Sequence, residues 1–138
     1  MRIVACLVLL LALAASLAAQ DKIKWRRVYT YSEAVIQMEE VQISLSAARR
    51  VRFRTVFKKA LPLRGRPDVK YKVIVEDMEL NCPAREYRVA ETVFLDRKDG
   101  VVVNSYKAGA DAPWKRVESD MMARLFDPAC AMIKKTKI

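Results

Sequence analysis

A strict alternation of apolar and basic residues near the middle of the chain constrains the fold most. Successive side chains of a β-strand point to opposite faces, so a period of two over nine residues predicts a long strand with one apolar and one basic face. Threonine and the bulky apolar residues of this stretch also suit a pleated, half-buried surface. The alternating residues are Val51, Phe53, Thr55 and Phe57 on one face, and Arg50, Arg52, Arg54 and Lys58 on or near the other.

Further strand-like runs stand on both sides of this stretch. Each is rich in β-branched or aromatic residues, and several alternate with polar residues. The runs cover residues 24–31, 41–45, 71–82, 87–95 and 101–106. Together with the central stretch they predict about six antiparallel strands.

The breaks between these runs predict the turns. Pro62, Gly65 and Pro67 interrupt the pattern and, with Arg64 and Arg66 between them, predict an exposed basic loop. The stretch from Asp96 to Gly100 predicts a hairpin turn in which Gly100 supplies a positive φ. Within 71–82 the apolar parity shifts once, around Glu76-Asp77, which indicates a β-bulge.

The carboxy-terminal segment has a helical period instead. Ser119 followed by Asp120 is typical of a helix start, and apolar residues then recur at spacings of three and four. Pro128 is expected to kink or divide this helix, which would place Cys130 on a second short turn. With the strands, this helix predicts an α+β fold in which β-structure dominates.

The first 19 residues have the layout of a signal peptide. Arg2 precedes an apolar run from Ile3 to Ala15, and small residues follow up to Ala19. We therefore expect residues 1–19 to be a cleaved signal peptide, with export to the periplasm or the outer-membrane surface and one domain over residues 20–138. An uncleaved membrane anchor is the alternative, but the apolar run is shorter than the roughly 20 apolar residues of a spanning helix. After cleavage of the signal we expect no transmembrane segment.

Removal of the signal leaves a basic domain with two cysteines. The net charge of the chain is +10, and the first 19 residues contribute only Arg2, so the domain keeps +9 and should be attracted to anionic surfaces. Cys6 is lost with the signal, which leaves Cys82 and Cys130. In an exported protein these two most simply form a disulfide, which would tether the helix to the sheet; two free thiols are the alternative.

The order and spacing of several residues resemble those of the bacterial surface-adhesin protein E-like family over nearly the whole of residues 20–138. They are a Trp near the domain start, Asn81-Cys82 followed by Tyr87-Arg88, the turn from Asp96 to Gly100 with Val101-Val102, then Trp114, Ser119 and Cys130. The resemblance implies a small exported domain with an antiparallel sheet and a carboxy-terminal helix held by a disulfide. The family is named after an adhesin that binds host matrix proteins, but many members are uncharacterised, so the name alone assigns no activity.

The composition argues against an enzyme. The chain contains no histidine, so histidine bases, Ser-His triads and histidine metal sites are excluded, and paired cysteines supply no thiolate. Glu76, Asp77 and Glu79 could be imagined as an acid and base pair, but neighbours on a strand point to opposite faces and a solvated acidic edge is the better interpretation. Asp96 and Asp99 fit turn chemistry better than calcium binding. No catalytic residue, metal or cofactor is predicted.

The candidate binding site is the row formed by Arg50, Arg52 and Arg54. On one face of a strand they would stand about 6.8 Å apart, and guanidinium groups bind phosphate and carboxylate groups in pairs of hydrogen bonds. The other interpretation is a solvated strand face, or an edge protected from aggregation by charge. We expect a non-catalytic, adhesin-like binding domain of the bacterial envelope, with a protein or an anionic glycan or lipid as its partner and not nucleic acid. The alternative is a structural or assembly protein that acts through strand edges, for instance as a homodimer.

Overall fold

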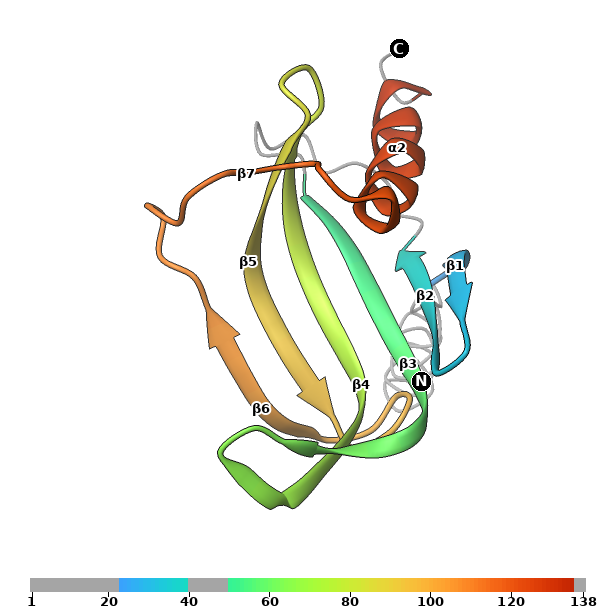
Figure 1. Ribbon diagram of the computed structural model, residues 1–138, viewed down its shortest axis with the longest axis vertical. Coiled ribbons are helices and arrows are strands. Elements are labelled where there is room, and N and C mark those ends of the chain that lie inside the picture. The colour runs from blue at the N-terminus through green and yellow to red at the C-terminus, as the bar shows by residue number, and fades with distance from the viewer. Residues whose placement is uncertain (1–22, 40–49, 136–138) are drawn as a thin grey trace, which may run out of the picture.

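The computed structural model describes residues 23–39 and 50–135, with side chains through residue 132. Within these residues six strands of one antiparallel sheet lie in chain order, and a short seventh, β7 (Lys115–Arg116), pairs with the beginning of β5 (Figure 1). The helix α2 (Asp120–Lys135) ends the described chain. The six strands are β1 (Trp25–Tyr31), β2 (Ala34–Glu39), β3 (Arg50–Leu63), β4 (Arg66–Asn81), β5 (Glu86–Leu95) and β6 (Val102–Lys107). The predicted α+β architecture is confirmed.

Strand β2 is an element that the sequence analysis did not predict. Ala34, Ile36 and Met38 are buried, whereas the residues between them are only half-buried. The segment was missed because Val35 interrupts the apolar alternation and glutamates flank it on both sides. The strand predicted over residues 41–45 and the signal peptide predicted over residues 1–19 lie outside the described residues.

The predicted basic loop from Pro62 to Pro67 is mostly strand. β3 continues to Leu63 and β4 begins at Arg66, so the turn consists of Arg64 and Gly65. Gly65 has a φ of 82°, a left-handed conformation that glycine adopts without steric cost. The prediction of exposure was correct, since the tip from Arg64 to Asp68 is solvent-exposed.

In the β5–β6 turn, the predicted role of Gly100 was wrong. The positive φ, 57°, belongs to Asp99. Gly100 is required for a different reason, because a Cβ at this position would lie 2.0 Å from the Asp96 Oδ1 atom and 2.9 Å from the Arg97 carbonyl oxygen. The Asp96 carboxylate closes the turn by accepting a hydrogen bond of 2.8 Å from the Val101 N–H.

The irregularity predicted near Glu76-Asp77 occurs at this level of the sheet, but the extra residue is on β5. Asp77 pairs with Glu91 and Met78 with Val89, so Ala90 is the additional residue. β4 keeps an unbroken register with β3 from Glu79 to Val73. The change of apolar parity in the sequence therefore reflects a central strand with apolar residues on both faces, not a bulge in β4.

Helix α2 begins as predicted and continues further than predicted. The Ser119 Oγ atom accepts a hydrogen bond of 3.1 Å from the Met122 N–H, which is N-cap geometry. The helix runs without interruption through Pro128, contrary to the expected division, so Cys130 lies on the same helix. Proline removes only one backbone hydrogen bond, and the packing of α2 and the disulfide between Cys130 and Cys82 hold this turn against the sheet.

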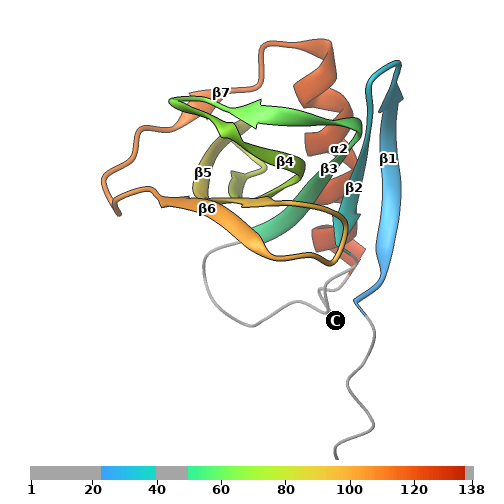
Figure 2. The same ribbon diagram turned by 90° about the horizontal axis from the view of Figure 1, so that it is seen from below.

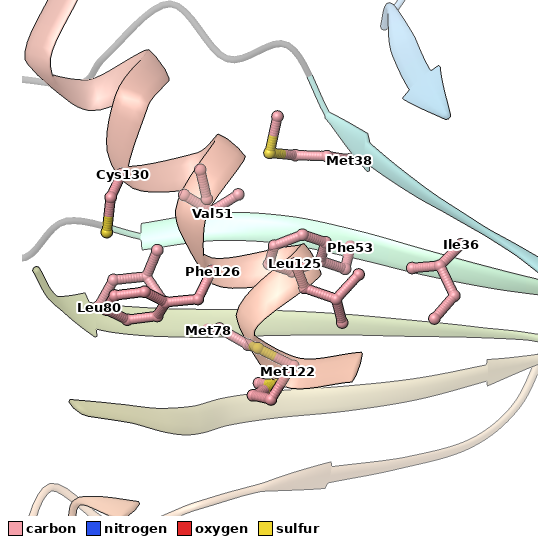
Figure 3. Packing of buried hydrophobic residues seen from close by; sticks show 11 residues of the cluster. Ile36, Met38, Val51, Phe53, Met78, Leu80, Met122, Leu125, Phe126 and Cys130 are labelled. Atoms are coloured by element: carbon pink, nitrogen blue, oxygen red, sulfur yellow. The ribbon is translucent and has the colours of Figure 1, made fainter. Parts of the chain in front are cut away.

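The hydrophobic core lies between α2 and one face of the sheet. Figure 3 shows side chains of the helix over those of β2, β3 and β4. The cluster comprises Ile36, Met38, Val51, Phe53, Met78, Leu80, Met122, Leu125, Phe126, Ala129 and Cys130. This packing leaves the opposite face of β3, which carries the arginines, turned away from the helix.

The sheet is strongly curved (Figure 2). Asp99 in the β5–β6 turn lies within 3.5 Å of the Arg54 guanidinium on β3, although β4 separates β3 from β5 in the sheet. The sheet must therefore curve around the arginine face. The arginine face is therefore partly enclosed.

Candidate functional site

The three arginines of β3 share one face of the strand, as the alternation predicted. Arg50 is the register partner of Glu79 on β4, and Arg52 is the partner of Asp77. The Arg50 Nη2 atom donates to the Glu79 Oε1 atom at 2.9 Å. The Arg52 guanidinium donates two hydrogen bonds to the Asp77 carboxylate, at 2.6 and 3.0 Å. Arg50 and Arg52 thus each form a cross-strand ion pair with β4.

Glu79 joins two arginines from different strands. Its Oε2 atom accepts a hydrogen bond of 2.5 Å from the Nε atom of Arg88 on β5, while its Oε1 atom accepts from Arg50. The residue is only 8 % exposed. The hydrogen bond from Arg88, together with that from Arg50, lowers the pKa of the Glu79 carboxyl below its usual value, although burial opposes the shift.

Arg54 is buried and occupied by internal contacts. Its Nε atom donates to the Gln37 Oε1 atom at 2.6 Å, and its guanidinium lies 4.2 Å from the centre of the Trp25 ring. The Arg54 residue is 6 % exposed, and this burial lowers its pKa, although the nearby Asp99 carboxylate opposes the change. Arg54 therefore holds β1, β2 and the β5–β6 turn together and is not accessible to an external partner.

Arg88 fixes the segment that follows β6. Its Nη1 atom donates to the carbonyl oxygens of Ala110 and Ala112 at 3.0 and 3.3 Å, and its guanidinium lies 4.7 Å from the centre of the Trp114 ring. Below this segment is a cavity of about 290 Å³. Its lining includes Arg50, Glu79, Arg88, Glu91, Lys107 and residues 108–112. Glu79 and Glu91 balance part of the positive charge in this lining, so the cavity has no strong preference for an anion.

Unpaired positive charge gathers elsewhere, at the end of the molecule opposite α2 (Figure 1). We call residues 58–72 and 96–102 the basic end. None of its cations lies within 4.0 Å of a carboxylate of the described chain. Within that chain, Arg66 is the one cation of this end whose side chain donates a hydrogen bond, to the Val103 carbonyl at 3.2 Å. Eight cations and three acids leave this end with a net charge of +5. The cations are Lys58, Lys59, Arg64, Arg66, Lys70, Lys72, Arg97 and Lys98.

Glu76 and Asp77 lie on opposite faces of the sheet. By register, Glu76 lies opposite Phe53 on the core face, whereas Asp77 lies opposite Arg52 on the other. Burial raises the pKa of the Glu76 carboxyl. No cluster of three or more acidic or cysteine side chains suited to a metal ion occurs in the described ranges. Asp96 closes its turn and Asp99 faces Arg54, so both serve the fold.

Several residues of the arginine network were not foreseen. Glu79 and Asp77 were treated as a solvated edge. The signal that could have identified the carboxylates is their spacing of two on β4, which matches the arginine spacing on β3. No sequence signal specifies Trp25 as the partner of Arg54, because that contact depends on the stagger of three strands.

The chain has no detectable relatives to guide the assignment: no family model, no curated protein and no solved structure matches it. Among the described residues, none of the helices combines the length and the apolar character needed to cross a bilayer.

Proposed function

We propose that this protein is an exported, non-catalytic binding domain of the bacterial envelope whose partner is anionic. The observation that carries the proposal is the basic end, where eight cations have no carboxylate partner within the described chain. The signal-like first 19 residues and the resemblance to the surface-adhesin protein E-like family support the envelope location. The lack of histidine and the disulfide between Cys82 and Cys130 favour a binding role over catalysis.

The basic end is a better candidate than the arginine row of β3. An anion at Arg50 or Arg52 would have to displace the Glu79 or Asp77 carboxylate, which is already desolvated and hydrogen-bonded. The Arg50 and Arg52 side chains are 59 % and 42 % exposed, but these carboxylates already balance their charges, so an external anion gains less there than at an unpaired cation. At the basic end no internal ion pair has to be broken, so the interaction with a partner is not opposed in this way.

The test is binding to a soluble polyanion such as heparin, measured over a range of ionic strength. In the test variant, which we call the tip variant, four cations at or near the β3–β4 turn are replaced: Arg64→Gln, Arg66→Gln, Lys70→Gln and Lys72→Gln. The matched control loses the same charge elsewhere on the exposed surface: Arg26→Gln, Arg27→Gln, Lys115→Gln and Arg116→Gln.

We expect the tip variant to lose most of its affinity at low ionic strength, while the control variant keeps most of it. Binding should weaken as salt is added, because exposed charges are screened. Equal losses in the two variants would show that only net charge matters and would overturn the assignment to the basic end.

A second candidate function, assembly through a strand edge, is favoured by the exposure of β6. This strand lies at the end of the strand order and pairs only with β5 in the described sheet. Val102 and Tyr106 are 55 % and 57 % exposed, and an open apolar edge is a template for pairing with another strand. Sedimentation velocity tests it: strand pairing predicts a dimer that persists at high ionic strength and dissociates in a Val102→Lys variant, and a monomer at all concentrations contradicts it.

A further inference from the structure

We infer that the basic end docks on an anionic lipid surface, with its cations at the headgroups and Val101 and Val102 in the interfacial region. This deepens the proposed function and rests on it. It names the partner as a bilayer and adds an apolar contribution that a soluble polyanion does not provide.

Two turns that are distant in sequence form this surface together. The β3–β4 turn and the β5–β6 turn lie at the same end of the molecule (Figure 1). They are joined by the hydrogen bond from Arg66 in β4 to the carbonyl of Val103 in β6. Helix α2 and the disulfide lie at the other end, so the core is remote from the proposed contact.

Exposed aliphatic side chains lie among the cations. Val101 is 67 % exposed and Val102 is 55 % exposed, and only Asp99 and Gly100 separate them in sequence from the exposed pair Arg97 and Lys98. Exposed apolar residues beside lysine and arginine are typical of proteins that bind at the surface of a membrane. The long cationic side chains can keep their charges at the headgroups while their stems lie along apolar surface.

The charge of this end suits an anionic membrane. Each lysine or arginine near such a surface contributes a favourable interaction that corresponds to about fivefold in affinity. The net charge of +5 is therefore sufficient for measurable binding at low ionic strength. The three acidic residues of this end, Asp68, Asp96 and Asp99, are already subtracted in this net charge.

Shape and apolar exposure favour a bilayer over a polysaccharide. The β3–β4 turn protrudes from the end of the molecule opposite α2 (Figure 1), so it can meet a broad flat partner. A polyanionic glycan gains nothing from two exposed valines, whereas a lipid interface removes their apolar area from water. The valines are thus the feature that distinguishes the two partners.

The experiment is co-sedimentation of the processed, disulfide-bonded protein with vesicles of equal parts phosphatidylglycerol and phosphatidylcholine, beside vesicles of phosphatidylcholine alone. We expect binding to the anionic vesicles and none to the neutral ones. The double variant Val101→Ser, Val102→Ser should bind the anionic vesicles about tenfold more weakly, with unchanged affinity for heparin. The control variant at Arg26, Arg27, Lys115 and Arg116 should still bind the vesicles.

The outcomes separate the two proposals. Binding to heparin without binding to the anionic vesicles overturns the lipid inference and leaves the proposed function standing. Failure to bind either one overturns both. Unchanged vesicle binding in the valine variant also overturns the inference, because the vesicle would then act only as a polyanion. Circular dichroism of each variant confirms that it is folded before the comparison is made.

Discussion

Replacing Glu79 with glutamine removes a carboxylate that joins three strands of the sheet. The side chain on β4 accepts hydrogen bonds from Arg50 on β3 and Arg88 on β5. Glutamine keeps the size of the side chain and one acceptor oxygen but loses the charge. Two arginines are then left beside each other without their shared counter-ion.

The expected loss of stability follows from the exposure of the partners. The Arg88 side chain is 22 % exposed, so its hydrogen bond to a charged group is worth about 1.5–3 kcal/mol. The Arg50 side chain is 59 % exposed, and solvent screening reduces its contribution to less than about 1 kcal/mol. Glu79→Gln should therefore lower the free energy of unfolding by about 2–3 kcal/mol at neutral pH, a fall of about 8–12 °C in Tm for a domain of this size.

The pH dependence of this loss provides the sharper test. The folded state lowers the pKa of Glu79, so its stabilisation is present above the unfolded pKa of about 4.3 and is lost as pH falls through the folded value. Urea unfolding of the oxidised protein and the variant, followed by circular dichroism, should show a difference at neutral pH that shrinks in acid. The control is Glu118→Gln, at an exposed glutamate with no ion pair. The reasoning would be refuted if Glu79→Gln lowered the free energy of unfolding by no more than Glu118→Gln does, or if its effect did not change with pH.

The remaining predictions concern the disulfide and the core-face carboxylate. The disulfide between Cys82 and Cys130 closes a loop over a separation of 48 residues, so its reduction should lower the free energy of unfolding by about 4 kcal/mol. Urea unfolding with and without reductant measures this loss. Equal unfolding midpoints in the two conditions would contradict the prediction. Glu76→Gln should raise Tm at neutral pH. Burial raises the folded pKa of Glu76, so its stabilising protonated form is lost as pH rises through that value. Thermal melts of protein and variant should converge in acid, and a lower Tm for the variant at neutral pH would contradict the assignment.

Much of the secondary structure was predictable because it depends on neighbouring residues. Alternation identified β3 and the N-cap residue Ser119 identified the start of α2, and both assignments were confirmed. The two cysteines indicated a disulfide, which the structure contains. Strand β2 was missed because its periodicity is interrupted, and the continuity of α2 through Pro128 was missed because tertiary packing compensates for a local penalty.

The candidate site was less predictable. Arg50, Arg52 and Arg54 share a face, as expected, but their accessibility depends on what lies opposite them. Arg54 is buried because Trp25 and Asp99, from distant parts of the chain, cover it. The sequence pattern of β3 contains no information about either contact.

Local chemistry in the sequence determined the α+β class, the positions of most strands, the helix start, the excess of positive charge and the absence of histidine chemistry. These properties depend on composition, on periods of two and of three to four, and on single capping residues, all of which act over short distances along the chain. Tertiary structure decided which charges remain available to a partner. The register of β3 against β4 neutralises Arg50 and Arg52, and the curvature of the sheet buries Arg54. The same curvature and pairing bring two separate turns together as the basic end, because a surface depends on how distant segments meet.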